Sequence, residues 1–248
     1  TALQANICVA VDAVEYADLH VLAAALKRTA AAGKRWLLRS AASILTALAQ
    51  LPPQPVAPEA MGCYTRNGKP GAILVGSHVP KTTAQLTQLL QESGVAPWEI
   101  DINRIPQASA TVLAEAQAHA AQAHAAGLTS VFYTSRHERV FANAETRLAF
   151  GVQVSALLMG LVQNLPPTLG FLISKGGITS NDVLSTGLAL PHMTLLGQIL
   201  PGVSVVRCPP EHPRYPNLPV VIFPGNVGDE TALVEAYRRM NYLVHNYI

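Results

Sequence analysis

Two patterns of apolar and polar residues alternate along most of the chain. Short apolar runs predict strands over residues 72–77, 98–103, 129–135, 169–175, 194–200, 203–207 and 219–223. Between them, apolar residues recur every three or four positions and predict helices over 82–93, 109–126, 145–163, from about 180 and from 229. Strands that are separated by helices of about ten or more residues indicate βαβ units. The pattern therefore predicts an α/β fold with a mainly parallel sheet, flanked by helices in three layers.

The first fifty residues show the same alternation on a smaller scale. Strands are expected over 9–13 and 35–38, and helices over 17–33 and 40–51. The segment "PPQPVAPEAMGCYTRNGKPG" that follows is rich in proline and glycine, which is typical of a linker. We therefore expect two domains, residues 1–55 and 56–248, the first being a small α/β remnant of a preceding domain. The chain opens on Thr1 and reaches a strand-like run within a few residues, so part of a longer chain is expected to be missing.

Composition narrows the range of partners and compartments. The net charge of +2 in 248 residues offers no basic stripe for nucleic acid. The longest apolar stretch, residues 150–165, is interrupted by four polar residues and predicts a buried core helix rather than a membrane span. Three cysteines in distant positions argue against a disulfide framework. With no secretory leader in the pattern, the expectation is a soluble cytoplasmic protein.

Glycine and small polar residues follow several predicted strands. Gly76 and Ser77 follow the first strand after the linker, Gly176 to Ser180 follow the strand that ends at Lys175, and Gly225 and Asn226 follow the strand 219–223. In parallel sheets, ligands bind outside the carboxyl ends of the strands. Glycine lets the backbone approach a ligand closely, and free N–H groups there attract phosphate. Ordinary turns use the same residue types, but three such turns at one sheet edge favour a phosphate or nucleotide site.

Other catalytic and metal-binding patterns are missing from the sequence. "NGKPG" at 67–71 lacks the spacing of a P-loop, and no G-x-G-x-x-G follows a strand. His119 and His124 are five residues apart and would point to different faces of a helix, so no metal ligand is predicted. No G-x-S-x-G or H-E-x-x-H motif supports a hydrolase. We assign no catalytic base.

Five stretches together resemble a known family. "ILVGSHVPKTTAQL" (73–86), "FYTSR" (132–136), "KGGITSNDV" (175–183), "GQILPGVSV" (197–205) and "VVIFPGNVGD" (220–229) occur in the order and spacing of one domain. They resemble the C-terminal nucleotide-binding domain of the four-carbon acid sugar kinases. Members of that family have also been called a domain of unknown function and type III effector Hrp-dependent outer proteins. Residues 7–50 further resemble the end of the family's N-terminal, acid-sugar-binding domain.

The resemblance implies ATP and Mg²⁺ as cofactors and a four-carbon acid sugar, such as threonate, erythronate or 3-oxo-tetronate, as substrate. By motif, the implied nucleotide contacts are Ser77, Gly176, Gly177, Ile178, Thr179, Gly225 and Asn226. Backbone N–H groups of the glycine turns would position the phosphates while Mg²⁺ neutralises charge, which phosphoryl transfer chiefly requires. A homodimer is expected by analogy with the family.

One family motif is missing from the sequence. The N-terminal domain of these kinases opens with Asp-Asp-x-Thr-Gly-Ala, which nothing in the chain matches. The chain is then either a fragment of a kinase or a protein that keeps only the nucleotide half. The alternatives are a non-catalytic nucleotide- or ligand-binding interaction module, and an α/β domain with ordinary turns.

Overall fold

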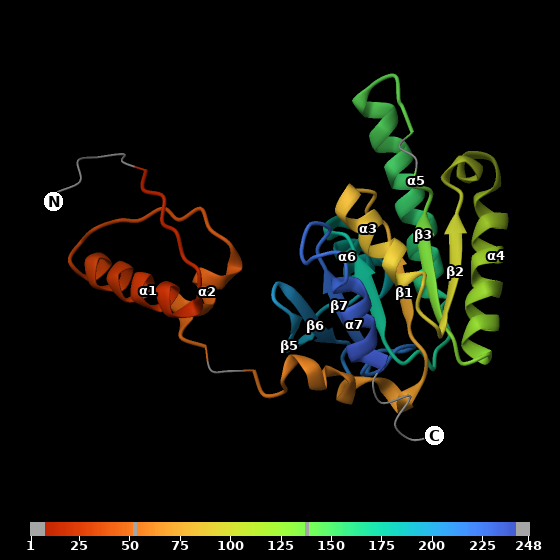
Figure 1. The fold of residues 1–248 in the computed structure, drawn as a ribbon. Helices are drawn as coiled ribbons and strands as arrows, with labels where there is room; N and C mark the ends of the chain where they lie inside the picture. Colours follow the sequence, from red (N-terminus) through yellow and green to blue (C-terminus); the bar gives the residue numbers. More distant parts are fainter. Residues whose placement is uncertain (1–7, 52–53, 137–138, 242–248) are drawn as a thin grey trace. The chain divides into compact units, whose positions relative to one another are not determined.

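The structure is a computed structural model that describes residues 8–51, 54–136 and 139–241 (Figure 1). It divides into two compact units, Thr1–Pro53 and Gln54–Ile248. The candidate chemistry lies in the second unit.

The first unit consists of two helices, α1 (Tyr16–Ala31) and α2 (Ala42–Ala49). Their shared core is small and is built from Ala23, Ile44 and Ala47 with Leu19, Leu22 and Leu48 packed against it. At the start of α1, the Asp18 carboxylate accepts hydrogen bonds from the backbone N–H groups of Val14 and Glu15 at 2.9 and 3.1 Å. These bonds satisfy backbone donors at the helix start and fix its first turn.

The two strands predicted for the first unit are wrong. Residues 9–13 and 35–38 have no strand structure, and the described part of this unit contains helices and loops only. Val9 and Val11 are 57% and 56% exposed, and Leu37 is fully exposed. A strand requires a neighbouring strand to complete its hydrogen bonds, and the described part of the unit supplies none.

The second unit is built on a seven-stranded sheet in the order β2-β3-β1-β4-β7-β6-β5. The strands are β1 (Ala72–Val75), β2 (Val95–Ile100), β3 (Thr129–Thr134), β4 (Leu172–Lys175), β5 (Thr194–Leu200), β6 (Val203–Arg207) and β7 (Pro219–Phe223). The pairs from β2 to β7 in this order are parallel, whereas β6 runs antiparallel to both β7 and β5. This confirms the predicted α/β fold with a mainly parallel sheet.

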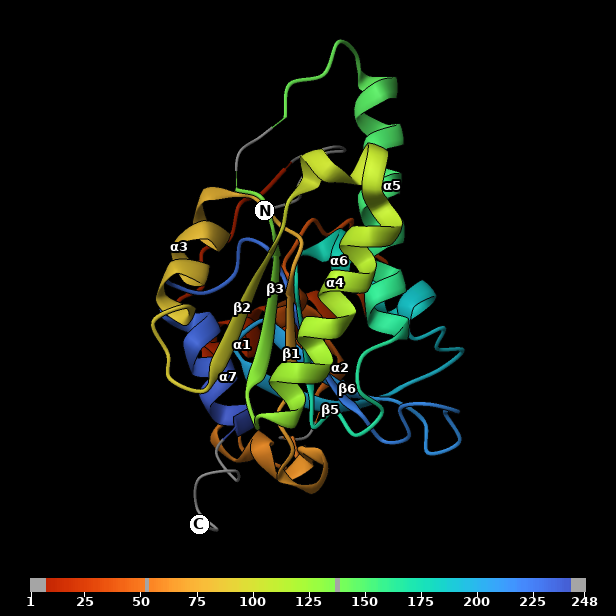
Figure 2. The ribbon, with the colours of Figure 1, turned by 90° about the vertical axis from the view of Figure 1, so that its right-hand side faces the viewer.

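Helices cover both faces of the sheet, as the view in Figure 2 shows. The longer ones are α3 (Pro80–Leu89), α4 (Ile105–Ala125), α5 (Ala144–Gln163) and α7 (Ala232–Asn241). Short helical segments are α6 (Gly177–Asp182), which continues as a π-helical turn (Val183–Gly187), and the 3₁₀ turns Pro58–Tyr64, Arg66–Gly68 and Ile102–Arg104. One core joins the sheet to α4, α5 and the turn after α6, and the other joins it to α3, α7 and the Pro58–Tyr64 turn.

The central strands are buried on both faces, which explains why apolar residues stand at consecutive positions in β1. In β1, Ala72 and Leu74 belong to the core beneath α4 and α5, whereas Ile73 and Val75 belong to the core beneath α3 and α7. Successive side chains of a strand point to opposite faces, so both must be apolar when helices cover both sides.

Only the C-terminal half of helix α5 is buried in the core. Its C-terminal half is buried through residues such as Leu157 and Leu161, but Leu148 and Val152 in its first half are 71% and 62% exposed. The sequence prediction of a buried helix over 150–165 therefore holds only for the second half. By length and composition alone, α5 would be long and apolar enough to cross a membrane. Its buried half packs instead on the same core as α4.

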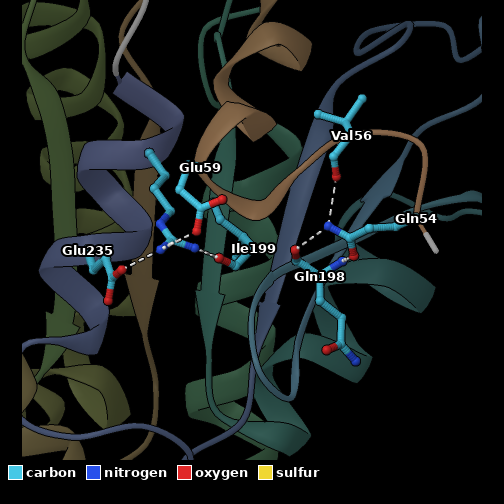
Figure 3. A network of polar contacts seen from close by, with 7 residues as sticks. Gln54, Val56, Glu59, Gln198, Ile199 and Glu235 are labelled. Carbon is cyan, nitrogen blue, oxygen red and sulfur yellow. Dashed lines mark hydrogen bonds and ion pairs between the residues drawn. The ribbon is translucent and has the colours of Figure 1, made fainter. Parts of the chain in front are cut away.

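A polar network fixes the start of the second unit to the far edge of the sheet (Figure 3). The Gln54 amide donates to the carbonyls of Val56 and Gln198 at 2.7 and 3.0 Å and accepts from the Gln198 N–H at 2.8 Å. On α7, Arg239 donates to Glu235 at 2.5 Å and to Glu59 at 3.1 Å, and also to the carbonyl of Ile199. The network holds β5, α7 and the chain before β1 in one arrangement.

Candidate functional site

The sheet order brings four strand ends together. Strands β3, β1, β4 and β7 are neighbours and parallel, so the turns that follow them lie along one edge. Backbone hydrogen bonds link these turns directly. The N–H of Gly76 donates to the carbonyl of Lys175 at 3.2 Å, and the N–H of Gly176 donates to the carbonyl of Phe223 at 2.8 Å.

Ser77 lies at the centre of the three glycine turns. A Cβ atom on Gly176 would come 3.2 Å from the Cβ of Ser77, and one on Gly225 would come 3.1 Å from its Oγ. Gly176 also has a φ of 125°, a conformation that L side chains rarely adopt. The backbone conformation therefore favours glycine at position 176, and Ser77 would crowd any side chain there.

Thr179 closes the same site from α6. A Cβ atom on Gly76 would collide with its Oγ1, and one on Gly176 would lie 3.1 Å from the same oxygen. The start of α6 is fixed by Ser180, whose Oγ donates to the carbonyl of Ser174 at 2.9 Å. Three turns distant in sequence thus meet within van der Waals range.

Helix α3 is hydrogen-bonded to the turn after β7 and lies close to the turn after β1. The buried Thr82 hydroxyl donates to the carbonyl of Gly225 at 2.9 Å and lies 3.3 Å from Ser77 Oγ. One turn later, the Gln85 amide donates to the carbonyls of Val227 and Asp229 at 3.0 and 2.6 Å. These bonds tie the loop after β7 to the helix after β1.

Arg136 is a partly buried cation next to Ser77. Its Nη2 donates to the carbonyl of Ser77 and to the hydroxyl of Thr83, both at 2.8 Å. Nε and Nη1 are buried, and residues 8–51, 54–136 and 139–241 provide no hydrogen-bond partner for them. Desolvation lowers the pKa of Arg136 from its ordinary value. The side chain ties the end of β3 to the turn after β1.

Lys175, the last residue of β4, is a second buried cation. Its side chain is fully buried, and Nζ donates to the carbonyl of Pro224 at 2.6 Å and to that of Gly225 at 3.4 Å. The ammonium also lies 3.9 Å from the centroid of the Phe223 ring. Desolvation, with a smaller contribution from the charge of Lys81, lowers the pKa of Lys175 to about 8.

A cavity of about 300 Å³ opens beside the glycine turns, between the ends of β1 and β3 and helices α5 and α6. Its wall includes Gly76 and Thr179 from the turns and apolar side chains such as Phe150 and Val154 from α5. Asp182 adds a carboxylate, which accepts a hydrogen bond from Ser155 Oγ at 2.6 Å. A volume of this size is at the lower end of the range for small-molecule sites, about 300–1,000 Å³.

Arginine and aromatic side chains border the same cavity. The guanidinium of Arg139 lies 4.8 Å from the ring centroid of Phe150 and 5.5 Å from that of Phe141. Arg147 and His78 also line the cavity. The cavity thus combines apolar walls with a basic border, next to backbone turns that lack side chains.

The residues predicted as nucleotide contacts differ in their surroundings. Ser77, Gly176, Thr179 and Gly225 lie together at the centre of the edge. Gly177, Ile178 and Asn226 are exposed, Ile178 at 82%, and Ile178 also lines the cavity.

Several polar residues at this edge were not predicted as site residues from the sequence. They are Lys175, Arg136 and Thr82, together with Asp182 on α6. In the sequence, the only indication of a role for Lys175 and Arg136 was their position at the ends of predicted strands. Their burial and their contacts with distant turns could not be seen in the sequence.

The comparison with family models decides what kind of domain this is. Residues 72–233 match the model of the nucleotide-binding C-terminal domain. The chain belongs to this family. The matched segment contains β1 to β7 and all the strand-end turns described above. No curated protein matches the chain in a sequence comparison.

Solved structures with the same fold come from three bacteria. A suggested tRNA synthase from Salmonella typhimurium LT2 is 22% identical with a TM-score of 0.62, and covers 92% of this chain. A Haemophilus influenzae protein of the family DUF1537 is 17% identical with a TM-score of 0.59, also over 92% of this chain. A Bordetella bronchiseptica domain of the same family, a domain-swapped dimer with bound citrate, is 19% identical with a TM-score of 0.56 over 93%.

At these identities the likeness shows a shared fold. This chain spans about half of each of the three proteins, 51%, 52% and 52% of their lengths.

Proposed function

We propose that the edge formed by the turns after β1, β4 and β7 binds the phosphates of ATP. The observation that carries this proposal is the close packing of three glycine turns: Gly76 lies against Thr179, Gly225 lies against Ser77, and Gly176 lies against both, at distances that leave little room for further side chains. The N–H groups of Gly76 and Gly176 already donate to the carbonyls of Lys175 and Phe223, so the other N–H groups of these turns would meet the anion. In the proposal the contacts are Ser77, Gly176, Gly177, Ile178, Thr179, Gly225 and Asn226.

The adjoining cavity would receive the nucleoside. Its apolar wall, with Phe150, Val154 and Ile178, suits the faces of a purine base. The Asp182 carboxylate and Ser155 hydroxyl provide acceptors for ribose hydroxyls or an exocyclic amine. Base and phosphates would then lie on either side of Gly76 and Thr179, which line both the cavity and the glycine turns.

The reaction we propose is phosphoryl transfer from ATP to a four-carbon acid sugar of the threonate, erythronate or 3-oxo-tetronate type. Resemblance to the acid sugar kinases supports this reaction, and the citrate bound by the Bordetella bronchiseptica relative is a hydroxy acid of related chemistry. Because the chain spans about half the length of that relative, the acid would be bound mostly by a further domain. In this proposal, residues 1–55 are the end of that acid-binding domain.

Mg²⁺ fits this site as an ion bound mainly by the nucleotide. In the described ranges, no group of three or more His, Cys, Asp or Glu side chains is placed to hold a metal. Mg²⁺ in nucleotide sites is usually held by phosphates, waters and one or two carboxylates. Asp182 is the carboxylate that lines the cavity next to the turns. When bound, the ion would neutralise charge on the phosphates.

Two further expectations belong to the same proposal. A homodimer is supported by the domain-swapped dimer of the Bordetella bronchiseptica relative. A reducing, cytoplasmic setting is supported by three free cysteines, of which Cys8 and Cys63 are exposed.

The test is a binding titration of the full chain with Mg-ATP, followed by an assay for ADP release on a panel of four-carbon acids. Saturating Mg-ATP should raise the thermal midpoint, since a ligand of the native state stabilises it by about 2.7 kcal/mol at 100 times Kd. Thr179→Val should weaken binding, whereas Thr87→Val, at an exposed position of α3, should not. An unchanged midpoint at millimolar Mg-ATP would contradict the proposal.

The non-catalytic alternative gives a different pattern in the same experiments. An interaction module would bind nucleotide and release no ADP with any acid, even when the full-length gene product is used. An α/β domain with ordinary turns would bind no nucleotide, and Thr179→Val would change stability alone.

A further inference from the structure

Lys175 occupies a place in the fold where a charge is costly. Its side chain is fully buried at the end of a central strand, between the turns after β4 and β7. No ion pair joins it to a carboxylate within residues 8–51, 54–136 and 139–241. Its partners are instead two carbonyl groups, of Pro224 and Gly225, and the face of the Phe223 ring. These contacts replace only part of the hydration that an ammonium loses on burial.

The charged groups on the surrounding elements do not neutralise it. On α3, Lys81 repels Lys175. At the end of β3, Arg136 donates to Ser77 and Thr83. On α6, the Asp182 carboxylate accepts from Ser155. After β7, Asp229 accepts from Thr231. Asp182 and Asp229 keep their negative charge in these bonds, and Glu99 acts on Arg136, but in the described part of the chain none of these carboxylates forms an ion pair with Lys175.

The carbonyls that Lys175 holds belong to the proposed phosphate site. Gly225 is the glycine packed against Ser77 Oγ, and its carbonyl also accepts from Thr82. The residue after Lys175 is Gly176, where a Cβ would lie 3.2 Å from the Cβ of Ser77. The ammonium thus connects the turn after β4 with the turn after β7.

We propose that Lys175 is a positioning residue for an anionic ligand: its ammonium fixes the Pro224–Gly225 turn and supplies buried positive charge beneath the bound phosphates. This inference rests on the proposed nucleotide site and adds a condition to it. Phosphate binding should require the protonated form of Lys175, because a neutral amine neither attracts the anion nor donates as strongly to two carbonyls.

A pH dependence follows from this condition. The pKa of Lys175 in the free protein is lowered to about 8 by burial and by Lys81. Phosphate groups with a second pKa near 6 are fully ionised at that pH, so the ligand itself does not titrate there. Affinity should fall by up to about tenfold per pH unit above pH 8 as the neutral form becomes dominant.

The experiment is calorimetric titration of the full chain with Mg-ATP between pH 7 and pH 9.5. Wild type should lose affinity above pH 8. Lys175→Met should bind on the order of tenfold more weakly at pH 7 and show a flat profile. Lys175→Arg, which keeps its charge throughout this range, should restore part of the affinity and also remove the decline. The matched control Lys81→Met, at an exposed position, should keep the decline and shift its midpoint to higher pH.

The outcomes separate this inference from the nucleotide proposal. Binding by wild type with the same affinity from pH 7 to pH 9.5 would overturn the role of Lys175 and leave nucleotide binding intact. Equal affinity of folded Lys175→Met and wild type at pH 7 would do the same. Should Lys175→Met fail to fold, the wild-type profile and the Arg variant decide the question. Absence of binding by wild type at every pH would overturn both proposals.

Discussion

Replacing Gly76 by alanine is a direct test of the packing between the turn after β1 and α6. The added methyl would collide with Thr179 Oγ1 and would lie 3.1 Å from its Cγ2 and 3.2 Å from its Cβ. Gly76 is not among the residues with positive φ, so the conflict is steric rather than a matter of backbone strain. Either the Thr179 side chain or one of the two turns has to move.

The magnitude follows from two opposing effects. Overpacking a well-filled site destabilises by about 1–3 kcal/mol, whereas a Gly→Ala change gains about 0.4–1 kcal/mol by restricting the unfolded chain. The net expectation is a loss of about 1–2 kcal/mol. For a domain of this size, this corresponds to a fall in Tm of roughly 2–8 °C. Because the displaced Thr179 is a proposed ligand contact, Mg-ATP affinity should fall as well.

Gly177→Ala is the matched control. A Cβ at Gly177 would meet no atom within 4 Å, and this residue is the first of α6. Its replacement should leave stability unchanged or raise it by up to about 1 kcal/mol.

A second control is the double mutant Gly76→Ala/Thr179→Ala. Removing the Thr179 hydroxyl and methyl relieves the collision. Thermal and urea unfolding of the four proteins in this cycle should show a coupling energy of about 0.5–3 kcal/mol. Additive effects, or equal losses for Gly76→Ala and Gly177→Ala, would refute the proposed packing.

Three further predictions concern buried polar groups. The free energy of unfolding of wild type, relative to that of Lys175→Met, should rise by about 3 kcal/mol between pH 8 and pH 10.5. The pKa of Lys175 is lowered to about 8 in the folded protein, so the unfolded chain, with a pKa near 10.5, binds more protons in this range. Urea titrations across this range should show no such rise if the lysine is solvated. Tyr215→Phe should cost about 1 kcal/mol in urea unfolding, because its buried hydroxyl bonds the carbonyls of Val162 and Leu165 at 2.8 and 2.9 Å; an unchanged midpoint would count against these bonds. Burial raises the pKa of the Cys208 thiol to about 12, so a thiol reagent should modify it only after unfolding, whereas exposed Cys63 should react in the native protein; rapid native labelling of Cys208 would contradict its burial.

The second unit could largely be predicted from its sequence because its strands are buried on both faces. The runs around 72–75, 129–134, 172–175 and 219–223 have apolar centres and are followed by glycine or small polar residues, which marks both the strands and their carboxyl ends. The predicted strands at 9–13 and 35–38 had the same local character but no strand partner in the described part of their unit. A local sequence pattern indicates a preference for extended backbone, but a segment becomes a strand only when it pairs with another strand.

The α/β class, the mainly parallel sheet and the glycine turns as candidate contacts thus follow from the order of the residues alone. Which of these turns meet depends on long-range strand pairing in the order β3-β1-β4-β7, which local sequence does not encode. Tertiary contacts also make Lys175 and Arg136 point into the protein rather than to solvent. A lysine at a strand end has the same local sequence whether hydrated or buried, and its free energy depends on neighbours about fifty residues away in the chain, at Pro224 and Gly225.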